Sequence, residues 1–485
     1  MDDYLPIPKL SLVGQTDAGK TAIIRTFLRN SSLGEMSPEA GSTQQIENYT
    51  LYLYDQNREI LTISDTPGFQ RLHKLRLEYL ENSAGKGSDS ISGICDFLDH
   101  GLGDIAPTFL HDSLSWHDIA DSDAVIAVID VSEDPAKPSY PRQSDLVYFL
   151  RLIQKEKHVL VLLNKLYLTN SKTDEWVKIL NNEQIPFVKY DANRSNIASD
   201  TDLFNRLADF FPKHREILNK KKNQRAEENR NRHETTLIEI SRYLLKIAQT
   251  REGVSLSDSN GHNKSENRIL NIFSAAEKSL VKSVTKVWGF KPAIVSNAGV
   301  FHEHTRFVNK IHISPSTRRI AVGAAIGALA DIPLFGLSFG SGSIIGAAAG
   351  GALGKVYDIA AHKAYGSSSD SMFLIPDTDF LRLAITRSLG LYRALSERGH
   401  GASIDDYNLI DLNKVLPHYI DPAVEFLQEK AVTGWASSFL AIHKFVLKNT
   451  QKLFAPGSID PDVSKLKQIL ASLSGFDNEN NLACN

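Results

Sequence analysis

The sequence predicts an α/β domain with a doubly wound parallel sheet, followed by a mostly α-helical C-terminal region. Residues 9–14 are mostly apolar and precede a glycine-bounded loop and an amphipathic helix, which is the order strand, loop, helix. Two continuous apolar runs, at 121–130 and 157–164, are typical of buried parallel strands and are separated by a helical pattern. Beyond residue 215 helical periodicity dominates, and residues 318–358 contain regularly spaced glycines.

Length and composition limit the possible classes of protein. At 485 residues the chain is too long for one ordinary core, and we expect three parts: 1–215, a helical connector at 216–300, and 301–485. A net charge of −3 gives no general attraction to nucleic acid or acidic lipid. Cys95 and Cys484 lie far apart, which argues against a disulfide framework or a zinc site and fits the cytoplasm. A secretory signal is not expected, because the first residues are acidic.

The loop after the first apolar run has the pattern G-x-x-x-x-G-K-[ST]. Gly14 and Gly19 lack a Cβ atom, so the backbone can turn tightly and direct its N–H groups at phosphates. The following helix adds its positive dipole end. Lys20 is expected to reach the β- and γ-phosphates, and Thr21 to bind Mg²⁺. We interpret this loop as a nucleotide-binding loop in preference to a plain glycine-rich turn.

A second set of polar residues follows a predicted hairpin. Two alternating runs, 48–55 and 59–64, predict the paired strands, and the second run ends in Asp65-Thr-Pro-Gly68. A carboxylate at the end of this strand is placed to hold Mg²⁺ through water, and the Gly68 N–H could donate to a γ-phosphate. The alternative is a turn that Asp65 caps.

Three further segments complete the predicted sheet. The run at 157–164 ends in Asn164-Lys165, and a short strand at 186–190 ends in Asp191-Ala192. Helical patterns cover 143–156 and 173–182. In a doubly wound sheet, ligands bind at the C-terminal ends of the strands, where these residues lie.

In this order, the motifs resemble the five loop motifs of small GTPases. Thr43 stands where the switch I threonine of that family closes on Mg²⁺ and the γ-phosphate, and Asp-Thr-Pro-Gly resembles the Era/TrmE-type bacterial branch. The resemblance covers about the first 210 residues. It implies GTP as the nucleotide, Mg²⁺ as the metal, and catalytic roles for Lys20, Thr43 and Asp17. It also implies a metal set of Thr21, Thr43 and Asp65.

The same resemblance implies the nucleotide-binding residues. Asn164 and Lys165 would brace the phosphate loop and flank the base, and Ala192 would offer a backbone N–H to the base. The full implied set is Gly14, Gln15, Thr16, Asp17, Ala18, Gly19, Lys20, Thr21, Asp65, Gly68, Asn164, Lys165, Asp191 and Ala192.

Two positions depart from the family pattern. The base-reading motif Asn-Lys-x-Asp ends here in Tyr167, and losing that carboxylate could cost on the order of 10²-fold in base discrimination. Guanine is therefore the inherited expectation, and ATP stays open. Phe69 stands where many GTPases place a water-orienting glutamine. Some relatives use a monovalent cation held by a phosphate-loop Asn, and Asp17 is the matching residue. We expect slow intrinsic hydrolysis, stimulated by a partner, by self-association or by K⁺.

Between the hairpin and the C-terminal region lie two less regular segments. The insertion at 71–116 combines a loop-like stretch at 85–93 with apolar residues, and its histidines lack the spacing of a zinc site. We interpret it as a movable effector segment. In the connector, 213–236 predicts a solvated helix, preferred over a basic face for lipid or RNA. An amphipathic stretch, a loop at 253–265 and a helix at 268–288 follow.

The glycine-rich stretch predicts a helical hairpin. Residues 320–354 carry one charge, Asp331, and many glycines are spaced by four residues, which places them on one helical stripe. Each costs about 1 kcal/mol in an exposed helix, so close helix–helix contact is needed to compensate. Asp331 and Pro333 predict the break between two arms. The hairpin either associates with the inner membrane, which we favour, or packs inside protein, since its arms are weak for a spanning helix.

Apolar stripes predict two long C-terminal helices, at 379–398 and 423–449. The hairpin followed by Leu-Tyr-Arg-Ala-Leu-Ser-Glu-Arg-Gly-His-Gly-Ala402 resembles a bacterial family in which an Era-like GTPase is fused to a helical domain of unknown function. The resemblance then covers most of the chain. It implies no reaction beyond nucleotide hydrolysis.

The sequence thus predicts a cytoplasmic, slowly hydrolysing GTP switch whose C-terminal domain associates with the membrane, with itself or with an unknown protein effector. One alternative is a nucleotide-regulated RNA or ribosome assembly factor; neutral pI and the lack of an RNA-binding module count against a nucleic-acid partner. Another is a nucleotide-binding scaffold with little turnover, which Tyr167 and Phe69 leave open.

Overall fold

The computed structural model forms two compact units. The first unit comprises residues 1–231 and 396–408, and the second comprises 232–395 and 409–485. Thr43 and the glycine-rich stretch 318–358 lie outside the described residues. The domain boundaries at 215 and 300 remain predictions. The structure describes residues 6–30, 33, 45–53, 58–83, 90–136, 143–254, 261–301, 308–313, 371–402, 410–412, 420–433 and 460–474.

The first unit is built on a six-stranded sheet in the order β2-β3-β1-β4-β5-β6. All strand pairs are parallel except β2 and β3, which form the predicted antiparallel hairpin. The doubly wound α/β prediction is therefore confirmed. The strands are β1 (Lys9–Gly14), β2 (Glu47–Leu53), β3 (Arg58–Asp65), β4 (Ala124–Asp130), β5 (His158–Asn164) and β6 (Phe187–Lys189).

Helices cover both faces of this sheet. On β4, Val125 and Ala127 belong to one hydrophobic cluster, whereas Ile126 and Val128 belong to the cluster on the opposite face. This alternation explains why the strands read as continuous apolar runs. The first face packs against α2 (Leu72–Ser83), α4 (Leu110–Asp121), α5 (Gln143–Gln154) and α6 (Thr173–Asn182), and the second against α1 (Lys20–Leu28) and α7 (Ile197–Phe210).

The insertion after β3 is largely helical where it is described. Its loop-like prediction is wrong from Ile91 onward, because Ser90 caps a helix there: the Gly93 N–H donates to Ser90 Oγ at 3.0 Å. Among the described residues, no group of three or more His, Cys, Asp or Glu side chains could hold a metal ion. Besides α2 and α4, the insertion contains α3 (Ile91–Asp96), the π-helix η1 (Phe97–Gly101) and the 3₁₀-helix η2 (Gly103–Phe109).

A short 3₁₀-helix, η3 (Pro212–His214), leads into α8 (Arg215–Gln249), which contributes residues to both units. The prediction of a solvated helix over 213–236 is wrong at Lys221 and Arg225, which are buried. The Arg225 guanidinium donates to Asp200 Oδ2 at 3.2 Å and to the Phe27 carbonyl at 2.6 Å. A long side chain can be buried in this way when its charged end is paired.

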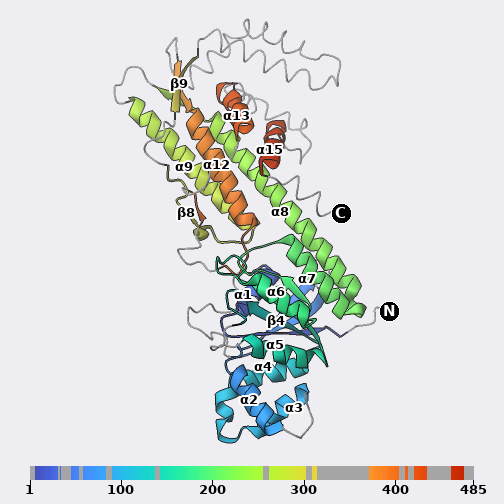
Figure 1. The fold of residues 1–485 in the computed structure, drawn as a ribbon. Coiled ribbons are helices and arrows are strands. Elements are labelled where there is room, and N and C mark those ends of the chain that lie inside the picture. The colour runs from blue at the N-terminus through green and yellow to red at the C-terminus, as the bar shows by residue number, and fades with distance from the viewer. Residues whose placement is uncertain are drawn as a thin grey trace. The chain divides into compact units, whose positions relative to one another are not determined.

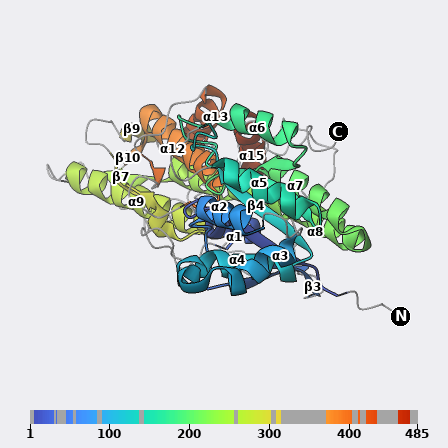
Figure 2. The ribbon, with the colours of Figure 1, turned by 60° about the horizontal axis from the view of Figure 1, so that its bottom comes forward.

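The second unit is mostly helical. Helices α9 and α12 lie side by side in both views (Figures 1 and 2), and the stacked rings of Phe273 and Phe380 join them. The loop predicted up to residue 265 is wrong at its end, because α9 already begins at Gly261; buried Ser265 donates to the Gly253 carbonyl at 3.1 Å and anchors this first part of the helix. The helices are α9 (Gly261–Val287), η4 (Pro292–Ile294), α12 (Thr378–Ser396), α13 (Asp421–Thr433) and α15 (Pro461–Ser474).

Two small sheets complete this unit. A three-stranded antiparallel sheet has the order β7-β10-β9, and a parallel pair joins β11 to β8. Their strands are β7 (Glu252–Val254), β8 (Val295–Ser296), β9 (Val308–Ile313), β10 (Ser371–Pro376) and β11 (Ile410–Asp411).

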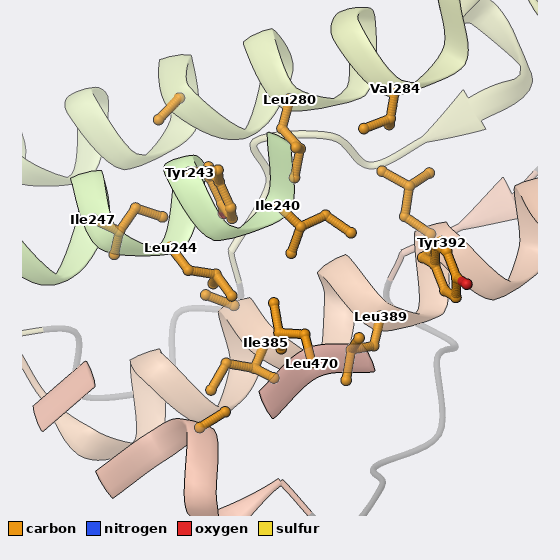
Figure 3. Close-up of a cluster of buried hydrophobic side chains, with 14 of the residues drawn as sticks. Ile240, Tyr243, Leu244, Ile247, Leu280, Val284, Ile385, Leu389, Tyr392 and Leu470 are labelled. Atoms are coloured by element: carbon orange, nitrogen blue, oxygen red, sulfur yellow. The ribbon is translucent and has the colours of Figure 1, made fainter. Parts of the chain in front are cut away.

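The core of the second unit is formed where α8, α9, α12 and α15 meet. Figure 3 shows Ile240 and Leu244 of α8 facing Leu280 of α9 and Ile385 of α12, with Leu470 of α15 beside them. This unit therefore buries a hydrophobic core of its own. Within the described ranges, no helix has the length and apolar character needed to cross a bilayer.

Candidate functional site

The loop between β1 and α1 has a shape that requires glycine at both ends. Gly14 has φ 151°, and a Cβ there would lie 2.5 Å from the Val128 carbonyl oxygen. Gly19 has φ 91°, and a Cβ there would lie 2.3 Å from Asn164 Nδ2. A side chain fits at neither position without displacing backbone or the asparagine. The loop pattern is therefore dictated by close contact with the ends of β4 and β5.

Lys20 lies buried inside this loop. Its Nζ donates to the carbonyl oxygens of Gly14 at 3.4 Å and Gln15 at 3.2 Å. Burial lowers the pKa of Lys20 to about 8, while the nearby charges of Asp65 and Asp17 act in the opposite direction. A buried ammonium group at the start of a helix, beside glycine-bounded backbone, is suited to binding a polyanion such as a triphosphate.

Thr21 and Asp65 form the candidate metal site. Thr21 Oγ1 donates to Asp65 Oδ2 at 2.5 Å, and Asp65 is 1 % exposed. Burial raises the pKa of Asp65, and the Thr21 hydrogen bond and the Lys20 charge oppose that rise. The other oxygen, Oδ1, is buried without a hydrogen-bond partner among the described residues. A hard cation with oxygen ligands fits such an oxygen, so these two residues would hold Mg²⁺.

The loop after β3 packs directly on the phosphate loop. A Cβ on Gly68 would lie 2.6 Å from the backbone of Thr16, and the Phe69 N–H donates to the Gly14 carbonyl at 2.9 Å. The Phe69 ring is buried, with its centroid 6.2 Å from that of Trp116 on α4. Position 69 therefore supplies a core side chain.

Helix α4 of the insertion also holds this loop. The Ser115 hydroxyl donates to the Pro67 carbonyl at 2.8 Å, and the Arg71 N–H donates to Asp112 Oδ1 at 3.4 Å. The carboxyl group of Asp112 is buried, and burial raises its pKa to about 7. The insertion thus helps to position the segment that follows Asp65.

The loops after β5 and β6 meet at Asn164. Its Nδ2 donates to the Ala18 carbonyl at 2.8 Å, and its Oδ1 accepts the Ala192 N–H at 2.9 Å. This side chain therefore joins the loop of residues 14–21, the phosphate loop, to the loop that begins at Asp191-Ala192. We call the second loop the base loop, because the sequence predicts that it contacts the base. In this structure the Ala192 N–H is engaged by Asn164, and its contact with a base remains a prediction.

The remaining residues of the predicted base site are also brought together. Lys165, with φ 62°, donates through Nζ to Asp130 Oδ2 at 2.5 Å. Asp191 accepts the N–H groups of Tyr167 at 3.1 Å and Asn193 at 2.9 Å, and burial raises its pKa. The Tyr167 side chain is 42 % exposed. A carboxylate thus lies beside position 167, but residue 191 supplies it.

The structure brings most of the predicted site together. The phosphate loop, Asp65, Gly68, Asn164-Lys165 and Asp191-Ala192 all lie at the C-terminal ends of the parallel strands. Asp17 is exposed on the phosphate loop, with φ 64°. Sequence reasoning missed Asp130, the partner of Lys165; its place at the end of a predicted buried strand was the available signal.

Sequence reasoning also missed Thr26 on α1 and the segment 396–402. Thr26 Oγ1 donates to the Ala192 carbonyl at 2.6 Å, and the Gly401 N–H donates to Thr26 Oγ1 at 2.8 Å. The Gly-His-Gly pattern at 399–401 was the one signal that could have marked this segment, since paired glycines can indicate a close backbone approach.

The family models agree with this geometry. Residues 9–165 match the model of the 50S ribosome-binding GTPase family. The N-terminal part of the chain is a P-loop GTPase domain. Residues 185–410 match the model of a domain of unknown function (DUF3482), so the chain joins this GTPase domain to a domain without an assigned role.

Two solved structures are among those similar to part of the chain. One is Era in complex with MgGDPNP and nucleotides 1506–1542 of 16S ribosomal RNA, with 16 % identity and a TM-score of 0.26 over 38 % of this chain and 51 % of Era. The other is the bacterial selenocysteine-specific elongation factor EF-Sec, with 20 % identity and a TM-score of 0.25 over 43 % of this chain and 29 % of EF-Sec. The chain thus spans about half of Era and less of EF-Sec. A search of curated proteins finds no match.

Proposed function

We propose that this chain binds Mg²⁺–GTP at the loop of residues 14–21 and hydrolyses it slowly as a molecular switch. The observation that supports this most directly is the buried Lys20 in a glycine-bounded loop at the N-terminus of α1, beside the Thr21–Asp65 pair. The match of residues 9–165 to a GTPase family supports GTP as the substrate. Bound Mg²⁺ would neutralise phosphate charge.

Slow hydrolysis follows from the side chain at position 69. A buried phenylalanine ring cannot orient a water molecule by hydrogen bonding, and the amide of the next residue, Gln70, contacts His111 Nδ1 at 3.1 Å. Stimulation is expected from a protein partner, from self-association or from K⁺. The exposed Asp17 carboxylate on the phosphate loop is the candidate K⁺ ligand. A rate that does not differ between K⁺ and Na⁺ buffers would exclude the role of K⁺.

The described residues support triphosphate binding more directly than they support selection of guanine over adenine. Tyr167 supplies no carboxylate, and both oxygens of Asp191 already accept backbone N–H groups. We expect GTP to bind more tightly than ATP, but by a smaller factor than in GTPases with a complete motif. Competition of the two nucleotides for the same site measures this factor.

The C-terminal domain is proposed to associate with the inner membrane of the cell, or with a protein partner, through residues 318–358. Spaced glycines flanked by cations in this stretch support the proposal. Co-sedimentation with liposomes of anionic and neutral composition tests it, with a protein lacking the stretch as the control.

A ribosome-binding function is the second candidate. It is supported by the match of residues 9–165 to the 50S ribosome-binding GTPase family. The chain's net charge of −3 gives no general electrostatic attraction to RNA. Co-sedimentation with ribosomal subunits, with GTP or GDP present, separates this candidate from the membrane proposal.

Substitution of the buried lysine tests nucleotide binding. Lys20→Ala removes the ammonium group inside the loop, and we expect at least about 100-fold weaker GTP binding, because charge-assisted contacts to phosphate are strong. Lys178→Ala, at an exposed position on α6, is the matched control and is expected to bind like the parent. Isothermal titration with GTP and ATP gives both affinities. Unchanged GTP affinity in the Lys20→Ala protein would refute the proposed site.

A further inference from the structure

After α12 the chain returns to the first unit and pairs with the base loop. Residues 396–408 belong to this unit. The Ser195 N–H donates to the Glu397 carbonyl at 2.9 Å, and the Gly399 N–H donates to the Asn193 carbonyl at 2.9 Å. Arg194 and Arg398 form an antiparallel bridge between these bonds. The returning segment therefore adds a short strand-like edge to the residues that directly follow Asp191-Ala192.

The two glycines of this segment permit a close approach to the base loop and α1. A Cβ on Gly399 would lie 2.2 Å from the Ala192 carbonyl oxygen. A Cβ on Gly401 would lie 2.4 Å from the Ala22 carbonyl oxygen and 2.9 Å from that of Ala192. Backbone atoms occupy the space on both sides, so no side chain fits without a shift. The Gly-His-Gly pattern is thus explained by contact with the nucleotide-site loops.

One hydroxyl group joins the three segments. Thr26 is 5 % exposed and lies on α1, the helix that begins with Lys20 and Thr21. Its hydroxyl donates to the Ala192 carbonyl at 2.6 Å and accepts the Gly401 N–H at 2.8 Å. Removing the hydroxyl would leave a buried carbonyl and a buried N–H without this partner, which would weaken the contact between the three segments.

We propose that residues 396–402 are a positioning segment of the nucleotide site, which holds the base loop through Thr26 and through pairing with 193–195. This proposal rests on the proposed GTP binding. Asn164 already joins the base loop to the phosphate loop, and the returning segment supports that loop from its other side. The segment directly follows α12, so it links the base loop by chain connection to the second unit.

The consequence is a two-way coupling. If the segment favours the loop geometry that binds the base, bound nucleotide must in turn stabilise the segment by the same free energy. A purely structural contact would instead affect all ligands of the site alike, or none of them. A ligand that has phosphates and no base therefore distinguishes a positioning role of the segment from a purely structural contact.

A matched pair of substitutions in the full-length protein tests the role of the segment. Thr26→Val keeps the shape and removes the hydroxyl, whereas Thr26→Ser keeps the hydroxyl. Affinities are measured by calorimetry for GTP and for inorganic tripolyphosphate, both with Mg²⁺. We expect Thr26→Val to weaken GTP binding about tenfold, the effect of roughly one lost buried hydrogen bond, and to leave tripolyphosphate binding unchanged. Thr26→Ser is expected to bind both ligands like the parent.

Other results would overturn the inference in distinguishable ways. If the Thr26→Val protein binds GTP like the parent, or loses affinity for GTP and tripolyphosphate equally, the positioning role is refuted. The parent protein would still bind nucleotide, so the proposed function would stand. A parent protein that binds neither ligand refutes the proposed function itself, and the inference falls with it.

Hydrogen exchange gives a second test that does not depend on substitution. Addition of a non-hydrolysable GTP analogue should slow exchange of the Gly399 and Gly401 amides at least about fivefold, which corresponds to a coupling of about 1 kcal/mol. Amides in the middle of α9 serve as the internal control. Unchanged exchange at 399 and 401, with saturating nucleotide, would contradict the coupling.

Discussion

Phe69 shows how a single residue can belong to the fold and not to the chemistry. It follows Asp-Thr-Pro-Gly, where many GTPases place a water-orienting glutamine, yet its ring is 4 % exposed and packs against Trp116. Its backbone N–H meanwhile donates to the Gly14 carbonyl at 2.9 Å. The main chain of residue 69 therefore contacts the phosphate loop, while its side chain is part of the core.

Because the side chain of residue 69 is part of the core, the structure predicts the outcome of replacing Phe69 with glutamine. Phe69→Gln should not raise the hydrolysis rate, because the side-chain position faces the core beside α4. It should lower the free energy of unfolding of the first unit by about 3–5 kcal/mol, through loss of packing and burial of a polar group. Urea unfolding and steady-state GTP hydrolysis are the measurements, and Phe69→Leu is the control that keeps an apolar side chain. A tenfold faster rate in Phe69→Gln would show that the side chain reaches the phosphates.

At the scale of elements, one buried ion pair joins α9 to α12. Arg387 donates through Nε to Glu277 Oε1 at 2.7 Å and through Nη2 to Oε2 at 2.8 Å, and both side chains are at most 3 % exposed. The same Nη2 donates to the Asn297 carbonyl at 2.6 Å. The charges are paired and hydrogen-bonded, which is the condition under which an ion pair can be buried.

Removing one partner of this pair should strongly destabilise the second unit. Arg387→Met leaves the Glu277 carboxylate buried without its counter-ion, and we expect a loss of about 3–5 kcal/mol in the free energy of unfolding. Arg382, on the same helix, forms a 2.6 Å pair with Asp421 in which the two side chains are 46 % and 39 % exposed. Arg382→Ala is the control and should cost less than about 1 kcal/mol. Equal effects of the two substitutions in denaturant unfolding would contradict the argument.

Elements with strictly local signals could be predicted from the sequence. Strands β4 and β5 are apolar on both faces because helices cover both, and the phosphate loop requires its glycines wherever it occurs. The burial of Arg225 could not be predicted, because its partners Asp200 and Phe27 come from other helices. The return of 396–402 to the base loop depends on contacts between segments more than 200 residues apart, and no periodicity in the sequence indicates such contacts.

At the scale of the whole molecule, the two units carry buried titratable groups with opposite pKa shifts. In the first unit, burial raises the pKa of Asp112 to about 7. In the second unit, burial lowers the pKa of His233 to about 4; its Nδ1 lies 2.7 Å from the Tyr392 hydroxyl, and its ring contacts Trp288 edge-on. Both pKa shifts favour the neutral form of the group. The Asp112 carboxyl group stays protonated up to a higher pH, and the His233 imidazole stays unprotonated down to a lower pH.

The signs follow from proton counting. For Asp112, the folded state binds more protons than the unfolded state between about pH 4 and 7, so its contribution to stability falls as the pH rises through that range. For His233, the unfolded state, with a pKa near 6.5, binds more protons down to about pH 4, so its contribution is present above about pH 6.5 and is lost as the pH falls. The largest change that each group can make in the free energy of unfolding is about 4 kcal/mol for Asp112 and about 3 kcal/mol for His233.

Acidification from pH 8 to pH 5 should therefore act on the two units in opposite directions through these two groups. Asp112→Asn, which holds residue 112 neutral at every pH, should flatten the response of the first unit and leave the second unchanged. His233→Asn, whose Oδ1 can still accept a hydrogen bond from Tyr392, should do the reverse. Native-state hydrogen exchange in low urea, corrected for intrinsic rates, reports each unit separately through amides of β4 and α9. If either substitution changed the pH response of both units equally, the two cores would unfold as one, and the assignment of these responses to single buried groups would be wrong.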